Sequence, residues 1–214
     1  MLGPRITRLG SGVNFEATLT RISRPILERL RSATGETANL AVLDGAHILL
    51  LDVLESSSRF KLVSHVGSHG AIHSTALGKA MLAYMEEGPQ KEELLASINF
   101  EASTPRTIRN IEMLRRDMAL TQKRGFSHDD EEAFTGARCI GAAVFGVHGT
   151  VVAAISVSGP TSRVSKERLS FFSTQVCQAA REISWALGYR ASKTERAIKS
   201  PRNPFIDSLS SMRA

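Results

Sequence analysis

Apolar and polar residues follow two periods along the chain, one typical of helices and one typical of strands. Residues 13–31 carry apolar side chains at helical spacing, and Pro25 should kink this helix or begin a second one. Two strand-like runs then flank Asp44-Gly45, a dipeptide that favours a tight β-hairpin. The run RFKLVSHVG, residues 59–67, is predicted as a third strand.

The middle of the chain changes to helical spacing. One helix is predicted to start after Ser74 or Thr75, where a hydroxyl side chain can cap its first turn. Residues 88–98 predict a short amphipathic helix. A longer helix follows between a capping Thr107 and a terminating Gly125. Helices therefore dominate this part of the predicted fold.

Strand spacing returns in residues 136–159, which predict two long strands that turn near His148-Gly149. A long helix is predicted after them, from Ser165 to Tyr189. The order of elements is thus helix, hairpin, strand, helices, hairpin, helix. We predict from this order an α+β domain with an antiparallel sheet, helices on one face, and another face left for something else.

Composition narrows the class of protein. Apolar residues make up 42% and charged residues 22% of the 214 positions, as in ordinary globular proteins. Neither a membrane-spanning apolar run nor the apolar region of a secretory signal is present in the sequence, so we predict a cytoplasmic protein. Cys139 and Cys177 lie in a predicted strand and a predicted helix. We expect both to be free thiols in a reducing compartment, although a single disulfide stays open.

The net charge of +6 and the pI near 9.7 suggest nucleic-acid binding, so the position of the charge matters. Residues 1–35 carry six arginines and two glutamates, and residues 189–214 likewise carry six basic and two acidic side chains. Each end therefore has a net charge of +4, and the part between them sums to −2. The basic character belongs to the ends, and we predict a disordered tail with at most weak, salt-sensitive attraction to DNA.

The segment HSTALGKA is the first candidate site. If a helix starts at Ser74, the backbone N–H groups of Thr75, Ala76 and Leu77 point outward at the positive end of its dipole. Such an end can bind an anion. The alternative is that a hydroxyl of Ser74 or Thr75 caps the helix and water satisfies the rest.

The segment AISVSGP is the second candidate. In a strand, Ser156 and Ser158 point to the same face, and on the neighbouring strand Ala137, Cys139 and Gly141 also share a face. Small and weakly polar residues in register across a hairpin leave space where a core would place valine or leucine. This pattern predicts either a cavity with two hydroxyls or a solvated face.

The segment SHDDEEAF is the third candidate, because it holds four consecutive acidic residues. Such a run is usually solvated, but one carboxylate, Asp129 among them, can turn inward to meet a ligand hydroxyl. A nucleophilic site of Cys139, His73 and Asp129 would also need a base in reach and an oxyanion hole. No local motif supports one, so we predict no catalytic residue.

The histidines His65, His69 and His73 recur every four residues, as metal ligands on one face of a helix do. Gly67 and Gly70 lie between them, and the segment is predicted as strand and loop, which removes that shared face. We therefore predict no metal site here and no cofactor.

Two longer motifs carry a resemblance. GAIHSTALGKAMLAYM, followed by RGFSHDDEEAFTGARCIGAAVFGVHGTVVAAISVSGPTSR, resembles the IclR family of bacterial transcription regulators over residues 13–188. The opening LGPRITRLG looks like the family's last winged-helix strand and the start of its linker. The resemblance thus implies residues 1–12 as a remnant of a winged helix-turn-helix domain, 13–188 as the effector-binding domain, and 189–214 as the tail. We expect a shortened chain, a late-placed start or a natural single-domain relative.

The resemblance implies a GAF-like domain whose antiparallel sheet packs helices on one face and holds a ligand pocket on the other. Its effector would be a small carboxylate, its partner a second or further copies in a homodimer or tetramer, and DNA would be bound only through the winged-helix domain, with no membrane contact. The pocket positions implied are Val63 and Val66 as an apolar wall, with His73, Ser74, Thr75, Ala76, Asp129, Ala137, Cys139, Ser156 and Ser158.

The resemblance also suggests a mechanism. The effector carboxylate would lie on the N–H groups of residues 74–77 and on the hydroxyls of Ser156 and Ser158, while Asp129 would accept from a ligand hydroxyl or hydrate. Ordering of the loop before the helix would then change how protomers pack. Two other classes stay open: a sensor domain for a nucleotide or tetrapyrrole, and, less favoured, an enzyme.

Overall fold

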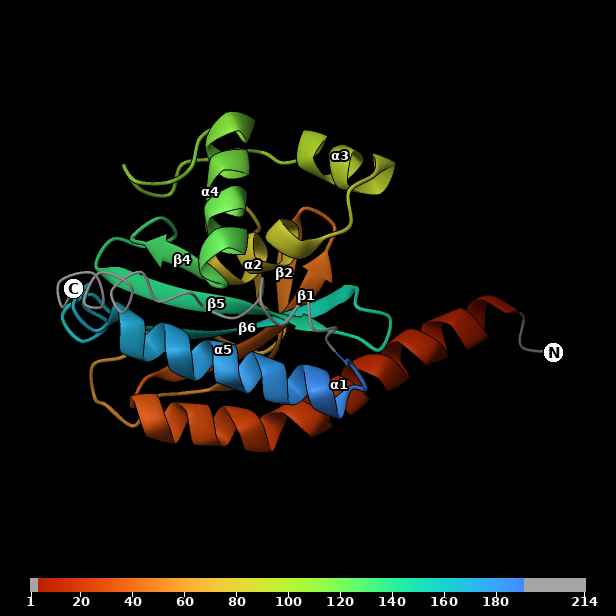
Figure 1. The fold of residues 1–214 in the computed structure, drawn as a ribbon, viewed down its shortest axis with the longest axis horizontal. Coiled ribbons are helices and arrows are strands. Elements are labelled where there is room, and N and C mark those ends of the chain that lie inside the picture. Colours follow the sequence, from red (N-terminus) through yellow and green to blue (C-terminus); the bar gives the residue numbers. More distant parts are fainter. Residues whose placement is uncertain (1–3, 191–214) are drawn as a thin grey trace, which may run out of the picture.

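The computed structural model describes residues 4–190, with side chains from Phe15 onward. It contains one six-stranded antiparallel sheet in the order β3-β2-β1-β6-β5-β4, with helices on both faces (Figure 1). The central strands β1 and β6 pair directly, although more than a hundred residues separate them in the chain. The strands are β1 Thr37–Asp44, β2 His47–Leu54, β3 His69–Ala71, β4 Ser127–Asp130, β5 Ala137–Phe145 and β6 Val151–Pro160.

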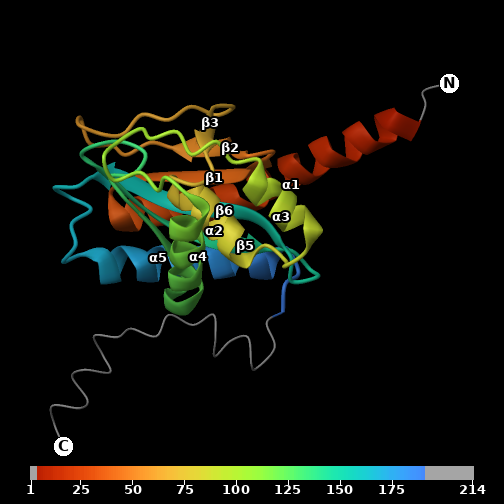
Figure 2. The same cartoon turned by 90° about the horizontal axis from the view of Figure 1, so that it is seen from above.

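Helices α1 (Pro4–Thr34) and α5 (Leu169–Ala186) cover one face of the sheet. The N-terminal half of α1 projects away from the body of the domain in both views (Figures 1 and 2). The main apolar core lies between these helices and the sheet, and its fully buried members include Leu27, Leu40, Ile140, Ile155, Val157, Phe172 and Ile183. Burial of this apolar surface is the main driving force that holds both helices on the sheet.

Helix α2 (Ala76–Tyr84) packs on part of the opposite face, and α3 (Pro89–Ala96) and α4 (Ile111–Arg124) form the layer around it. Every residue of α2 from Ala76 to Ala83 is buried, because α2 is enclosed between the sheet and the outer helices. A helix surrounded in this way carries no polar stripe toward solvent. The expected α+β fold with an antiparallel sheet is confirmed, with α2 as an additional layer on the second face.

Several local predictions are confirmed. The hairpin of β1 and β2 turns at Asp44-Gly45, where Gly45 has a φ of 55°. Thr75 caps α2, and Gly125 ends α4 in the left-handed conformation with a φ of 83°. Helix α1 runs through Pro25 without a break, so the alternative of a second helix starting there is wrong.

Three predicted elements differ from the structure. Residues 59–67 form a loop and not a strand; the third strand is the short β3, which follows Gly67 in a left-handed turn. Helix α4 is capped by Asn110, because the Thr107 hydroxyl donates to the carbonyl of Glu132 instead. Helix α5 begins at Leu169, since residues 161–168 form turns and bends.

Helix α1 includes the first described residues of the chain. Residues 4–12, which resemble a winged-helix strand and linker in sequence, belong to the first turns of α1. The predicted tail from residue 191 onward lies outside the described residues. Within residues 4–190, none of the helices combines the length and apolar character needed to cross a membrane.

Candidate functional site

Five polar side chains form a line across four neighbouring strands on the face that α2 only partly covers. We call this line the polar row; it consists of Asn39, Ser156, Ser158, Cys139 and Asp129. Asn39 lies opposite Ser156, Ser158 lies opposite Cys139, and Cys139 lies opposite Asp129 in the antiparallel registers. Cross-strand partners share a face, so the register brings together side chains from β1, β6, β5 and β4.

The polar row is connected by hydrogen bonds. The Asn39 side-chain amide donates from Nδ2 to Ser156 Oγ at 3.2 Å and to Ser158 Oγ at 3.0 Å. Ser158 and Asp129 are the cross-strand neighbours of Cys139 on its two sides. Burial, followed by the negative charge of Asp129, holds the pKa of Cys139 well above its usual range. The neutral thiol is therefore a hydrogen-bonding group and not a nucleophile.

Asp129 turns inward from the acidic run and is 1% exposed. Its Oδ1 accepts from the backbone N–H groups of Glu132 at 2.7 Å and Ala133 at 3.3 Å, which closes the loop after β4. Burial raises the pKa of Asp129, and the nearby charge of Lys79 opposes that shift. The Oδ1 oxygen thus holds the loop through two hydrogen bonds. Asp129 is therefore a structural residue as well as a candidate ligand contact.

The first turn of α2 lies beside the polar row. The Thr75 hydroxyl accepts from the Gly78 N–H at 3.1 Å, which confirms the capping prediction. Ser74 and Ala76 are both buried, with 2% and 1% exposure. The Thr75 N–H, expected to point outward, instead donates to the Ala71 carbonyl at 3.2 Å, so the donors left at the positive end of the helix dipole are the N–H groups of Ala76 and Leu77.

Gly141 contradicts the expectation that small residues leave open space on this face. A Cβ there would approach both the Ala76 carbonyl oxygen and Ser127 Oγ to 2.7 Å. The Ser127 hydroxyl itself donates to the Ala76 carbonyl at 2.5 Å. The missing side chain therefore permits close contact between α2 and β5, and this contact fixes the first turn of α2 next to Ser156 and Cys139.

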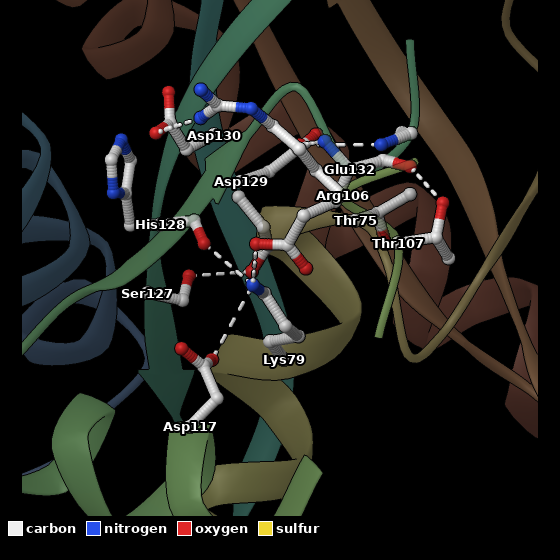
Figure 3. Close-up of polar contacts among 12 residues, drawn as sticks. Thr75, Lys79, Arg106, Thr107, Asp117, Ser127, His128, Asp129, Asp130 and Glu132 are labelled. Carbon is white, nitrogen blue, oxygen red and sulfur yellow. Dashed lines mark hydrogen bonds and ion pairs between the residues drawn. The ribbon is translucent and has the colours of Figure 1, made fainter. Parts of the chain in front are cut away.

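Sequence reasoning missed Lys79, a fully buried lysine in α2. Its Nζ donates to Glu132 Oε1 and to the His128 carbonyl, both at 2.5 Å, and lies 3.4 Å from Asp117 Oδ2 (Figure 3). The one available signal was a lysine within an otherwise apolar helix, a position where charge is rare unless it is paired. Burial raises the pKa of Glu132 to about 7, against the opposing influence of Lys79.

The segment between α3 and α4 clamps the acidic loop from outside. The Thr107 hydroxyl donates to the Glu132 carbonyl at 2.6 Å, and the Thr104 hydroxyl donates to the Glu131 carbonyl at 2.7 Å. Arg106 pairs with Asp130 at 2.7 Å, in the upper left part of Figure 3. These bonds tie the loop that carries Asp129 to the outer helical layer.

The predicted pocket residues His73, Val63 and Val66 lie apart from the row, whereas Ala137 shares the face of Cys139 as expected. His73 is buried against the Phe100 ring, and its Nε2 lies 3.2 Å from the Glu101 carbonyl oxygen; burial lowers its pKa. Val63 and Val66 are 60% and 62% exposed in the loop between β2 and β3, so they do not form a buried apolar wall. Ala137 is buried at the start of β5.

The structure also shows the state of the two cysteines and the contacts of the spaced histidines. Cys139 and Cys177 are both free thiols, as expected. His69 pairs with Asp44, with 2.7 Å between Nε2 and Oδ2, and so does not share a face with His73. In the described part of the chain, no three or more His, Cys, Asp or Glu side chains are grouped to hold a metal ion.

Comparison with known proteins extends the sequence resemblance. The family model described as "Bacterial transcriptional regulator IclR C-terminal" matches residues 15–185. The HTH-type transcriptional regulator BhcR of Paracoccus denitrificans is 38% identical over 196 residues, which are 92% of this chain and 70% of that protein. The transcriptional repressor IclR of Escherichia coli is 35% identical over 87% of this chain and 69% of its own length.

Solved structures agree with this assignment. The crystal structure of Thermotoga maritima IclR has a TM-score of 0.77 at 32% identity, covering 87% of this chain and 75% of that chain. An IclR homologue from Microbacterium hydrocarbonoxydans, complexed with 4-hydroxybenzoate, has a TM-score of 0.72 over 87% and 75% of the chains; at 24% identity this likeness concerns the fold alone. The chain therefore belongs to the IclR family of bacterial transcriptional regulators and contains that family's C-terminal domain.

Proposed function

We propose that this domain binds a small carboxylate effector at the polar row and that binding controls a transcriptional regulator. The observation that carries the proposal is the buried polar row itself. Buried polar side chains cost free energy unless they are hydrogen-bonded, and a purely structural sheet would place apolar side chains there. A set of hydroxyl, amide, thiol and carboxyl groups beside a helix N-terminus instead suits a small polar ligand.

The surrounding charge favours an anion. The first turn of α2 presents backbone donors next to Ser156, and the helix dipole adds a partial positive charge there. Lys79 lies on the same helix, one turn further along, and its charge acts on both Asp129 and Cys139. Asp129, at the other end of the row, would repel a second carboxylate, so a monocarboxylic acid fits better than a dicarboxylic acid.

Two further points support the proposal. The Microbacterium homologue of similar fold is complexed with 4-hydroxybenzoate, which is a small carboxylic acid. The acidic loop beside the row is tied to the outer helices through Thr104 and Thr107, so a ligand that contacts this loop acts on a larger part of the domain. In a homodimer or tetramer, a shift of these helices would change protomer packing and thereby reposition DNA-binding domains.

The double variant Ser156→Ala/Ser158→Ala tests the site. Keto, hydroxy and aromatic acids are screened by thermal shift, in which a ligand at about one hundred times its Kd adds about 2.7 kcal/mol, a shift of several degrees. Isothermal titration then gives the affinity of the acid that binds. We expect the double variant to bind it about tenfold or more weakly, because the ligand loses the hydroxyl groups of both serines.

The double variant leaves the Asn39 amide without its serine partners, which costs about 1–3 kcal/mol of stability, so affinities are compared at a temperature where both proteins are folded. Thr174→Ala is the matched control, since Thr174 is exposed on α5, beyond the opposite face of the sheet. It should leave affinity unchanged. Equal affinity in the double variant and the wild type would place the effector elsewhere.

A further inference from the structure

The hydrogen bonds of the polar row start at the Asn39 side chain. Asn39 Nδ2 donates to both serine oxygens, so both amide hydrogens are used and each serine oxygen accepts one of them. Cys139 lies opposite Ser158 and Asp129, and both side chains influence the pKa of its thiol. The row thus begins with an amide on β1, whose two hydrogens are used on the serines, and ends with a carboxylate on β4.

Two groups remain unused at the start of this series. Asn39 is only 2% exposed, and its Oδ1 has no hydrogen-bond partner among the described residues. The Ser156 hydroxyl accepts from Asn39 but has no acceptor for its own hydrogen within the same part of the chain. Asn39 and Ser156 are directly opposite each other, so an open acceptor and an open donor lie side by side.

The pair matches one kind of chemical group. A hydroxyl can donate to Asn39 Oδ1 and accept from Ser156 at the same time, whereas a keto oxygen or a carboxylate only accepts and a methylene does neither. An unpaired buried acceptor costs free energy, so filling it discriminates between ligands of equal size. We propose that Asn39 and Ser156 select an effector that carries a hydroxyl substituent next to its carboxylate; this inference rests on the proposed function.

Access to the pair depends on the loop between β2 and β3. Thr37 lies opposite Ser158 on the same face, and its hydroxyl donates to the Leu62 carbonyl of this loop at 3.3 Å. The backbone N–H of Ser56 in turn donates to the Thr37 hydroxyl at 3.1 Å. The loop is therefore held against the Asn39 end of the polar row.

Two sets of acids that differ only at carbon 2 test the selection. Lactate, pyruvate and propionate form one set, and mandelate, phenylglyoxylate and phenylacetate form the other. Isothermal titration of the wild type should show the hydroxy acid of the better-fitting set binding about tenfold tighter than the other two members. Asn39→Ala and Ser156→Ala should each reduce this preference, measured as the ratio of affinities within one set, to about threefold or less.

Ser156→Thr is the conservative control, because it keeps a hydroxyl at the position and should retain the preference. A wild type that binds all members of a set equally, or a preference that survives Asn39→Ala, overturns the inference and leaves the carboxylate site in place. If none of the six acids binds, the proposed carboxylate function fails and the inference fails with it. Circular dichroism of each variant checks that the fold is intact.

Discussion

Lys79→Met is expected to destabilise the domain by about 3–5 kcal/mol at pH 8, because removing one partner of a buried ion pair leaves the other charge without compensation. Lys79 is fully buried, and its Nζ lies 2.5 Å from Glu132 Oε1 and 3.4 Å from Asp117 Oδ2. Methionine fills much of the same space but offers no donor to either carboxylate or to the His128 carbonyl. Urea denaturation followed by circular dichroism measures the loss.

The loss should depend on pH. The pKa of Glu132 is already raised by burial to about 7, with Lys79, Asp129, Asp117 and Arg124 as the charged groups around it. Without Lys79 that pKa rises further, so Glu132 takes up a proton and is buried in its neutral form. The difference in stability between wild type and variant is therefore smallest well below pH 7 and grows as the pH rises through about 7.

Two variants serve as controls for Lys79→Met. Lys123→Met removes an exposed lysine on α4 and should change the free energy of unfolding by less than about 0.5 kcal/mol. Adding Glu132→Gln to Lys79→Met removes the charge left behind and should restore part of the stability at pH 8. A single variant within about 1 kcal/mol of wild type at pH 8 would mean that the ion pair is solvated in solution.

Gly78→Ala is expected to cost about 3 kcal/mol or more, against the usual gain when alanine replaces glycine inside a helix. A Cβ at Gly78 would lie 2.3 Å from the Ile72 carbonyl oxygen and 2.5 Å from the Ile72 Cα. Both are backbone atoms, so no side-chain rotation relieves the contact, and α2 must move away from the segment that precedes it. Thermal and urea denaturation measure the effect.

This displacement should also reach the effector site, because α2 carries both the first turn beside the polar row and Lys79. Any acid that binds the wild type is therefore expected to bind Gly78→Ala more weakly. Gly88→Ala is the matched control: no atom lies within 4 Å of a Cβ there, so stability and affinity should stay near wild type. A Gly78→Ala protein as stable as wild type would contradict the close contact.

The sequence by itself determined the features that depend on neighbouring residues. The Asp44-Gly45 turn, the Thr75 cap and the Gly125 helix end were predictable because turn and cap chemistry acts over two to four residues. The shared face of Ser156 and Ser158 followed from the two-residue period of a strand. Family motifs in fixed order were sufficient to assign the IclR C-terminal domain.

The tertiary structure decided what each buried polar group meets. Asn39 became part of the row only because β1 pairs with β6 in a register that sets it opposite Ser156, a residue 117 positions away. Lys79 is buried because the loop after β4 and helix α4 both reach it with carboxylates. Val63 stands in a loop although its segment has strand-like composition. Such outcomes depend on contacts between distant segments, and local periodicity holds no information about them.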